Sequence, residues 1–280
     1  MNVFRFLRVA SLFCFLLPLF LSAQTNCNEG AGPLDPAKPS GITEDQIIQK
    51  FSAAEAEFQR QYDAYGFTQE IKVDTLEGND VTGEFRRISN IHFDNDRRME
   101  YVTFSPQSTL RGAELSKEDF DDIQSSPFIL TTKGLPQYTV RYAGRQKVDQ
   151  LQTYVFDVAP RQLVKGRRYF QGRVWVDQKA LQVVKTCGKN VPDAIPEKPS
   201  RLSRLMRRKK GQQAQNITPT MVTYRELIDG KYWFPTYRRA DDVLEFVNGF
   251  ATEKVTIREI IKLTNYQRGA FQKPPLMTAK

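Results

Sequence analysis

Alternating apolar and polar residues in the second half of the chain predict β-strands. Within Arg168–Val176 every second residue falls on the same face of a strand, and Tyr154–Val158 and Leu181–Cys187 have the same character. Pro160 is expected to end the first of these runs, because proline cannot donate to a sheet ladder. Bulky residues occur on both faces of this series, which favours a sheet that curls around something over a flat sheet with one face in water.

One long stretch has helical spacing instead. Thr43 is a good N-cap, and Gln46 three residues later predicts a capping box. The helix is expected to cover Glu44–Tyr65 and to end at Gly66. Its apolar stripe consists of Ile47, Ile48, Phe51, Ala54, Phe58, Tyr62 and Tyr65. A stripe of this length must cover a large apolar surface.

The remaining strand-like runs form an antiparallel series with short connections. They are Phe67–Leu76, Glu84–Phe93, Arg98–Phe104, Phe128–Leu130, Tyr138–Val148, Leu151–Val158, Met221–Ile228, Lys231–Tyr237, Val243–Val247 and Lys254–Asn265. Asp229-Gly230 is a strong hairpin signal, and Ala240-Asp241-Asp242 predicts a further turn. We predict an α+β fold in which a large, strongly curved antiparallel sheet of about 10–11 strands forms an unclosed β-barrel beneath an amphipathic helix lid.

The N-terminus has the features of a cleaved secretory signal over residues 1–23. Arg5 and Arg8 precede the apolar run Val9–Leu21, and small residues lead to a cut after Ala23. A membrane anchor is the alternative, but the run is short and contains Pro18. Because no Cys follows Ala23, the pattern of a lipid-anchored protein is missing, and we expect a product in the periplasm or outside the cell.

The rest of the chain is expected to hold one domain with flanking segments. Residues 24–42, rich in Pro and Gly, predict a flexible leader, and residues 43–268 the half-barrel domain. Residues 190–219 interrupt the strands with Pro192, Pro196, Pro199 and a basic run, and residues 269–280 predict a tail.

The net charge of +9 over 280 residues raises nucleic acid or an anionic membrane as a partner. Most of the excess lies in the insert, whose arginines Arg201, Arg204, Arg207 and Arg208 are candidates for contact with an anionic membrane surface or an acidic envelope protein. The alternative is a solvated loop, which charge runs commonly form. Basic residues mixed with stacking aromatics on a sheet face are not evident, so nucleic acid is not expected as a partner.

Cys27 and Cys187 remain after signal removal. An even pair in an oxidising compartment suggests a disulfide between them. Two unpaired thiols are the alternative, and the sequence alone gives no distance that would decide.

Groups for catalysis and metal binding are sparse. His92 is the single histidine and lies in a strand-like run without an acidic cluster, so a structural role is expected for it. Cys187 has no second Cys at metal-ligand spacing, and no Gly-x-Ser-x-Gly elbow or phosphate-binding Gly-rich loop occurs. We therefore expect no catalytic residue, no metal, no cofactor and no enzymatic activity. A hydrolase using two distant carboxylates is the weakest hypothesis.

Bulky apolar residues on the helix and the later strands are candidates for lining a ligand cavity. They are Phe51, Phe58, Tyr154, Phe156, Phe170, Trp175, Tyr224, Trp233 and Phe234. Core packing against the helix is the alternative role. A curved sheet of this size has room for a ligand between sheet and helix.

Two segments resemble the LolA/LolB-like superfamily of outer-membrane lipoprotein-sorting proteins, in its periplasmic carrier-like branch. The similarity lies in Tyr169–Asp177 with the Val184-Lys185 and Gly188-Lys189 pairs, and in Thr223–Glu226 with Asp229–Tyr237. The resemblance implies an unclosed barrel whose helix lid covers a hydrophobic cavity for acyl chains. Because it lacks the Cys that would carry a lipid anchor, the chain resembles the soluble carrier of this superfamily more than the anchored acceptor.

Two functions follow as hypotheses. The first is a periplasmic carrier for lipids or lipoprotein acyl chains. The alternative is an envelope protein-interaction or stress-sensing module on the same fold without lipid cargo, because a fold does not fix a function.

Overall fold

A computed structural model describes residues 25–94, 97–112, 115, 120, 128–192, 213–214, 219–248 and 251–269. The expected signal peptide, the C-terminal tail and Arg201, Arg204, Arg207 and Arg208 of the insert lie outside the described residues. Within these ranges the structure has one α-helix, one 3-10 turn and an eleven-stranded antiparallel sheet. The described part of the chain contains no helix with the length and apolar character needed to span a lipid bilayer.

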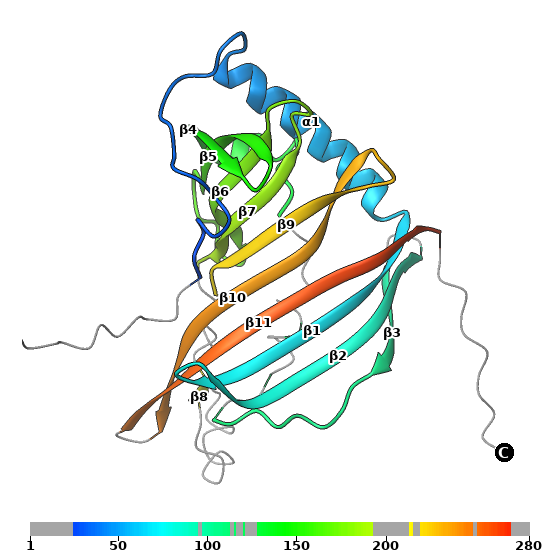
Figure 1. The fold of residues 1–280 in the computed structure, drawn as a ribbon, viewed down its shortest axis with the longest axis vertical. Coiled ribbons are helices and arrows are strands. Elements are labelled where there is room, and N and C mark those ends of the chain that lie inside the picture. Colours follow the sequence, from blue (N-terminus) through cyan, green and yellow to red (C-terminus); the bar gives the residue numbers. More distant parts are fainter. Residues whose placement is uncertain are drawn as a thin grey trace, which may run out of the picture.

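The elements follow one another along the chain with mostly short connections (Figure 1). Their bounds are α1 Glu44–Tyr62, β1 Tyr65–Glu77, β2 Asp80–Asp94, β3 Arg97–Phe104, η1 Leu135–Gln137, β4 Tyr138–Val148, β5 Leu151–Pro160, β6 Tyr169–Asp177, β7 Val183–Val191, β8 Gln213–Ala214, β9 Met221–Ile228, β10 Tyr232–Asn248 and β11 Ala251–Arg268.

The strand order is β3-β2-β1-β11-β10-β9-β7-β6-β5-β4, and the short β8 pairs with β10. The two ends of this order, β3 and β4, do not meet, so the sheet is open. The first strand pairs with the last: Tyr65 lies opposite Arg268 and Ile71 opposite Ile261. This confirms the predicted α+β class, with a large curved antiparallel sheet and a single helix crossing one face (Figure 1).

The helix begins as the sequence predicts. Thr43 Oγ1 accepts a hydrogen bond from the Gln46 backbone N–H, and the Gln46 side chain accepts one from the Thr43 backbone N–H, which completes the capping box. The helix ends at Tyr62, earlier than expected, and β1 starts at Tyr65. Tyr65 therefore belongs to the sheet and not to the helix stripe.

The turn expected at Ala240-Asp241-Asp242 is wrong, because β10 runs through it without interruption. Asp241 is tolerated inside the strand because Arg239 Nε donates to its Oδ2 at 2.8 Å and Arg258 Nε donates to its Oδ1 at 2.7 Å. The hairpin expected at Asp229-Gly230 is present, with both residues at positive φ as that turn requires.

The segment after the expected signal peptide is fastened to the sheet and is not a free leader. We call residues 25–37 the strap. Ala31 and Asp35 form β-bridges to Val148 and Arg145 along the outer edge of β4. Gly144 permits this approach, since a Cβ there would lie 2.3 Å from the Asp35 carbonyl oxygen. The strap therefore covers one edge of the sheet before the chain enters α1.

The two faces of the sheet are set by strand alternation. One continuous row of laterally paired residues faces α1 and runs through Ile71, Ile261, Arg238, Thr223, Thr186, Val174 and Phe156. We call this side the helix face. The opposite side, whose row contains Trp175, Lys185 and Tyr224, lies under the strap, and we call it the strap face.

Candidate functional site

The candidate site is the interface between α1 and the helix face. The first half of α1 places Ile47 and Phe51 in a buried cluster with Phe156 and other residues of β5, β6 and β7. The second half places Phe58 and Tyr62 in a separate buried cluster with β1, β2, β10 and β11. One amphipathic helix thus bridges both halves of the open sheet.

Four of the predicted cavity residues meet in these clusters. The ring centroids of Phe51 and Phe156 are 5.6 Å apart, and those of Phe58 and Phe234 are 5.4 Å apart. These four side chains are 0–3% exposed. Ring contacts therefore occupy the space at these positions, where the sequence had predicted an open cavity.

Tyr154 and Phe170 also lie on the helix face, in the cluster of Phe51. Phe170 stacks on Phe128 with ring centroids 4.0 Å apart, and Phe128 belongs to the segment that leads into β4. The interface thus combines apolar side chains from three parts of the chain: the sheet, α1 and this connecting segment.

A buried ion pair lies between the two apolar clusters. Arg225 of β9 donates from Nη1 to Glu55 Oε1 at 2.7 Å and from Nη2 to Glu55 Oε2 at 3.0 Å. The two side chains are only 1% and 3% exposed. Arg225 Nη2 also donates to the Phe128 carbonyl oxygen at 2.9 Å. One guanidinium therefore ties α1, β9 and the segment before β4 together.

The surroundings of this pair are unusual for two charges. The Arg225 guanidinium carbon lies 4.6 Å from the centre of the Phe58 ring, and among the described residues Arg225 Nε has no hydrogen-bond partner. Burial raises the pKa of the Glu55 carboxyl, an effect that the Arg225 charge opposes. Desolvating both charges costs free energy, so the pair is weak evidence for stability.

The second apolar cluster also has a polar border. Arg238 is 9% exposed, and burial lowers the pKa of its guanidinium while the Glu259 charge raises it. The neighbouring Tyr62 has a pKa raised to about 12, chiefly by burial. Tyr266 donates its hydroxyl proton to the Pro235 carbonyl oxygen at 2.6 Å. The helix face therefore combines aromatic rings with guanidinium groups and is not uniformly apolar.

Sequence reasoning missed both members of the Glu55–Arg225 pair. A signal for Glu55 was present: it stands four residues after Phe51 and three before Phe58, in the middle of the apolar stripe. A carboxylate at such a position needs a buried partner. Nothing in the sequence singles out Arg225 among the basic residues as that partner.

Three of the predicted cavity residues lie on the other side of the sheet. Trp175 is fully buried on the strap face, and Tyr224 and Trp233 pack against the same cluster around Val155, Val184 and Val222. Their assignment to a space under the helix is therefore corrected. The sheet carries bulky groups on both faces here because the strap covers the second one.

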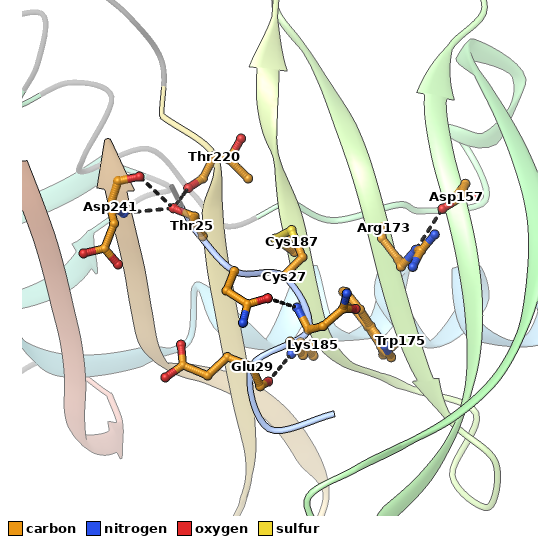
Figure 2. The surroundings of a disulfide bond; sticks show 12 residues. Thr25, Cys27, Glu29, Asp157, Arg173, Trp175, Lys185, Cys187, Thr220 and Asp241 are labelled. Carbon is orange, nitrogen blue, oxygen red and sulfur yellow. Dashed lines mark hydrogen bonds and ion pairs between the residues drawn. A yellow bond between two sulfur atoms is a disulfide. The ribbon is translucent and has the colours of Figure 1, made fainter. Parts of the chain in front are cut away.

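Figure 2 shows how the strap is attached around Cys187 of β7. A disulfide joins Cys27 of the strap to Cys187. Thr25 Oγ1 donates to the Thr220 carbonyl oxygen at 2.6 Å and accepts from the Asp241 backbone N–H at 2.9 Å. Gly32 donates its backbone N–H to the Lys147 carbonyl oxygen at 2.8 Å. The attachment thus reaches from β10 across β7 to β4.

Lys185 is buried beneath the strap (Figure 2). Its Nζ lies 4.8 Å from the ring centres of both Trp175 and Tyr224 and donates to the Glu29 carbonyl oxygen at 2.8 Å. Burial lowers the pKa of Lys185 to about 8, although the Asp149 and Glu29 carboxylates oppose this. An ammonium between two rings is a cation–π arrangement that favours the closed strap.

The described residues contain no group of three His, Cys, Asp or Glu side chains placed to hold a metal ion. His92 is partly buried in β2, opposite Met99 of β3. The helix face instead offers rings that can contact an apolar chain and a guanidinium fork that can bind an anion.

Comparison with known proteins gave matches among solved structures. No protein-family model matches the sequence, and no curated protein matches it. A DUF1329 family protein of Desulfovibrio piger is 13% identical, with a TM-score of 0.37, over 80% of this chain and 95% of that chain. A LolA superfamily protein of Nitrosomonas europaea is 12% identical, with a TM-score of 0.33, over 86% and 99%.

A third similar structure is a Vibrio parahaemolyticus domain named for outer membrane lipoprotein sorting. It is 11% identical, with a TM-score of 0.35, over 81% of this chain and 95% of that chain. TM-scores below 0.5 mark distant likenesses, so the fold described above rests on this chain's own strand order and register. The solved structures to which the chain is similar do include the lipoprotein-sorting proteins that the sequence resemblance named.

Proposed function

We propose that this protein is a periplasmic binding or carrier protein for lipids or lipoprotein acyl chains, with α1 as a movable lid. The observation that carries the proposal is the aromatic helix face, closed by a single helix across an open sheet. Displacing α1 would expose Phe156, Phe234 and their neighbours to a ligand. Each buried CH₂ of an acyl chain would then contribute about 0.8 kcal/mol.

Titration of the mature protein with a fluorescent fatty acyl probe tests the proposal, together with hydrogen exchange of α1. We expect saturable binding and faster exchange in α1 than in β1 and β11, because a lid must open more easily than the sheet. A protein that binds no acyl probe, or whose α1 exchanges as slowly as the sheet, would contradict the carrier hypothesis.

A cross-link can test the lid directly. The hydroxyl oxygens of Ser52 on α1 and Thr132 before β4 are 3.4 Å apart, so Ser52→Cys with Thr132→Cys is placed to join the helix to its surroundings. We expect the oxidised double variant to lose probe binding and to regain it on reduction. Wild type under the same reductant and the single Ser52→Cys variant are the controls. Undiminished binding by the cross-linked protein would show that α1 is not the lid.

A protein-interaction module is the second candidate, and the free edge of the sheet favours it. Met99, Tyr101 and Phe104 of the edge strand β3 are 39–46% exposed. An exposed apolar edge can pair with an extended segment of another protein. Replacing Tyr101 by Lys would then abolish capture of the partner, whereas a carrier that works alone would keep its acyl-probe binding after the same change.

The expected export and the basic insert belong to the same proposal. Cleavage after Ala23 would deliver the protein to the periplasm, and the arginines of the insert would meet an anionic membrane or an acidic envelope protein. The intact mass of exported protein tests the first part. A mass that retains residues 1–23 would indicate an anchored protein instead.

A further inference from the structure

The buried Glu55–Arg225 pair suggests which lipids the helix face would take. We propose that Arg225 binds the anionic headgroup of a lipid. In the closed state the Glu55 carboxylate would occupy the position that this headgroup takes when α1 is open. The ligand would be an amphiphile with a carboxylate or phosphate group and an apolar chain. This inference rests on the proposed function, because it concerns the same face of the sheet.

Arg225 contacts the Glu55 carboxylate in the way that a guanidinium group contacts a bound anion. Both Glu55 carboxylate oxygens accept from Arg225, at 2.7 Å and 3.0 Å, in the forked arrangement that guanidinium groups use for carboxylates and phosphates. Glu55 is carried by α1, the element that must move for a ligand to enter. Opening the lid would therefore withdraw the carboxylate from Arg225 and leave the fork on the sheet.

The position of Arg225 on the sheet supports a headgroup site. Arg225 lies on β9, and the two apolar clusters of the helix face flank it on the sides of β10 and β7. Phe58, whose ring lies against the guanidinium, belongs to the cluster on the side of β10. An anion held at Arg225 would place its chain directly beside aromatic rings. The Phe128 carbonyl, which also accepts from Arg225, would keep the guanidinium oriented after Glu55 has left.

The free-energy cost of leaving Arg225 buried without an anionic partner would make the site select anionic ligands over neutral ones. The Arg225 side chain is only 1% exposed, and leaving a buried guanidinium without its carboxylate or a replacement is strongly unfavourable. Movement of α1 would break the Glu55–Arg225 pair. An anionic ligand would replace the Glu55 carboxylate as the partner of Arg225. A neutral ligand of equal chain length leaves Arg225 unpaired. Anionic amphiphiles should bind more tightly for this reason alone.

The first test uses the wild-type protein and three amphiphiles with the same chain. Displacement of a fluorescent acyl probe is measured with myristate, tetradecyl phosphate and tetradecanol. We expect the two anions to bind about ten- to a hundredfold more tightly than the alcohol, the range for a hydrogen bond to a charged group. A preference between carboxylate and phosphate then identifies the kind of headgroup that the site accepts.

The second test removes the internal competitor. Glu55→Gln keeps the shape of the side chain but not its charge, so myristate should bind about tenfold more tightly than to wild type. Glu57→Gln, on the same helix but paired with Arg60 at the surface, is the matched control and should bind as wild type does. Circular dichroism establishes that both variants are folded.

The outcomes separate this inference from the proposed function. Equal affinity for myristate and tetradecanol in wild type would overturn the headgroup site and leave the carrier function standing. No displacement and no probe binding would overturn both. An unfolded Glu55→Gln variant does not affect the comparison of the three amphiphiles in wild type, which decides by itself.

Discussion

The two faces of the sheet are covered in different ways. On the helix face, α1 is held by ring packing and by the Glu55–Arg225 pair, all of them noncovalent contacts. On the strap face, residues 25–37 are held by a disulfide and by main-chain hydrogen bonds. Bulky residues occur on both faces of the sheet, but α1 is attached without a covalent bond, whereas the strap is attached with one.

This difference agrees with the proposed function, in which α1 moves and the strap does not. A disulfide restricts the movement of the segment that it joins, and it stabilises a cover that only shields a core. In the proposed function α1 exposes the helix face, while the strap stays over Trp175 and Lys185. The predictions below test this contrast, from the largest expected effect to the smallest.

Phe234→Ala should have the largest effect on stability. Phe234 is fully buried and contacts Phe58 and Tyr65, with ring centroids 5.4 Å and 4.9 Å away. Its loss should lower the free energy of unfolding by about 3–5 kcal/mol, measured by urea denaturation.

The neighbouring Trp233→Ala is the matched comparison on the opposite face. Trp233 is only partly buried, so a smaller loss is expected with no change in acyl-probe binding. If both variants lost the same stability and both lost probe binding, the proposal that only the helix face binds the ligand would be wrong.

Removing the disulfide with Cys27→Ser and Cys187→Ser should lower the free energy of unfolding by about 2–4 kcal/mol. The cross-link spans 160 residues, so it restricts the unfolded chain over much of its length. Hydrogen exchange should speed up in the strap more than in α1. Acyl-probe binding at a temperature where the variant stays folded should be unchanged, and a loss of binding would implicate the strap in the site.

Lys185→Met should change how stability depends on pH. The pKa of Lys185 is about 8 in the folded protein, against an ordinary value of 10.5. Between these values the unfolded chain binds the proton more tightly, so the stability of wild type relative to the variant should rise with pH from about 8 to about 10. Thermal unfolding over this window measures the trend.

A difference between wild type and Lys185→Met that stayed constant with pH would contradict this prediction. It would mean that the ammonium under the strap is not desolvated.

Asp35→Asn should have the smallest effect. Asp35 pairs with Arg145 at 2.6 Å at the edge of β4, but both side chains are well exposed, at 52% and 37%. Solvent and salt screen such a pair, so no measurable change in the unfolding midpoint is expected. A large loss would mean that this ion pair, more than the disulfide and the main-chain bonds, fixes the strap.

The sequence predicted the elements well because their signals are local. The capping box at Thr43 and the hairpin at Asp229-Gly230 depend on residues a few positions apart, and both are present. The uninterrupted path of β10 through Asp241 was missed because Arg258, which neutralises that carboxylate, comes from the next strand. Alternation alone could not show this.

The candidate site was predicted only in part, for a similar reason. Spacing placed Phe51 and Phe58 on one face of α1, and both lie in the interface. Trp175 was assigned to the wrong side, because alternation shows that a strand has two faces without showing what covers each. The strap that covers Trp175 lies more than 130 residues earlier, a separation that the Cys27–Cys187 spacing of 160 illustrates.

The pairing of β1 with β11 has a consequence for how the chain is made. The ribosome delivers β1 early and β11 last, so the strand that joins the two halves of the sheet is the final one to appear. Until then β1 is paired with β2 alone, and an unpaired strand edge of this kind is prone to aggregation. A chain that stops before residue 251 should therefore keep this edge of β1 exposed and aggregate more readily than the complete chain.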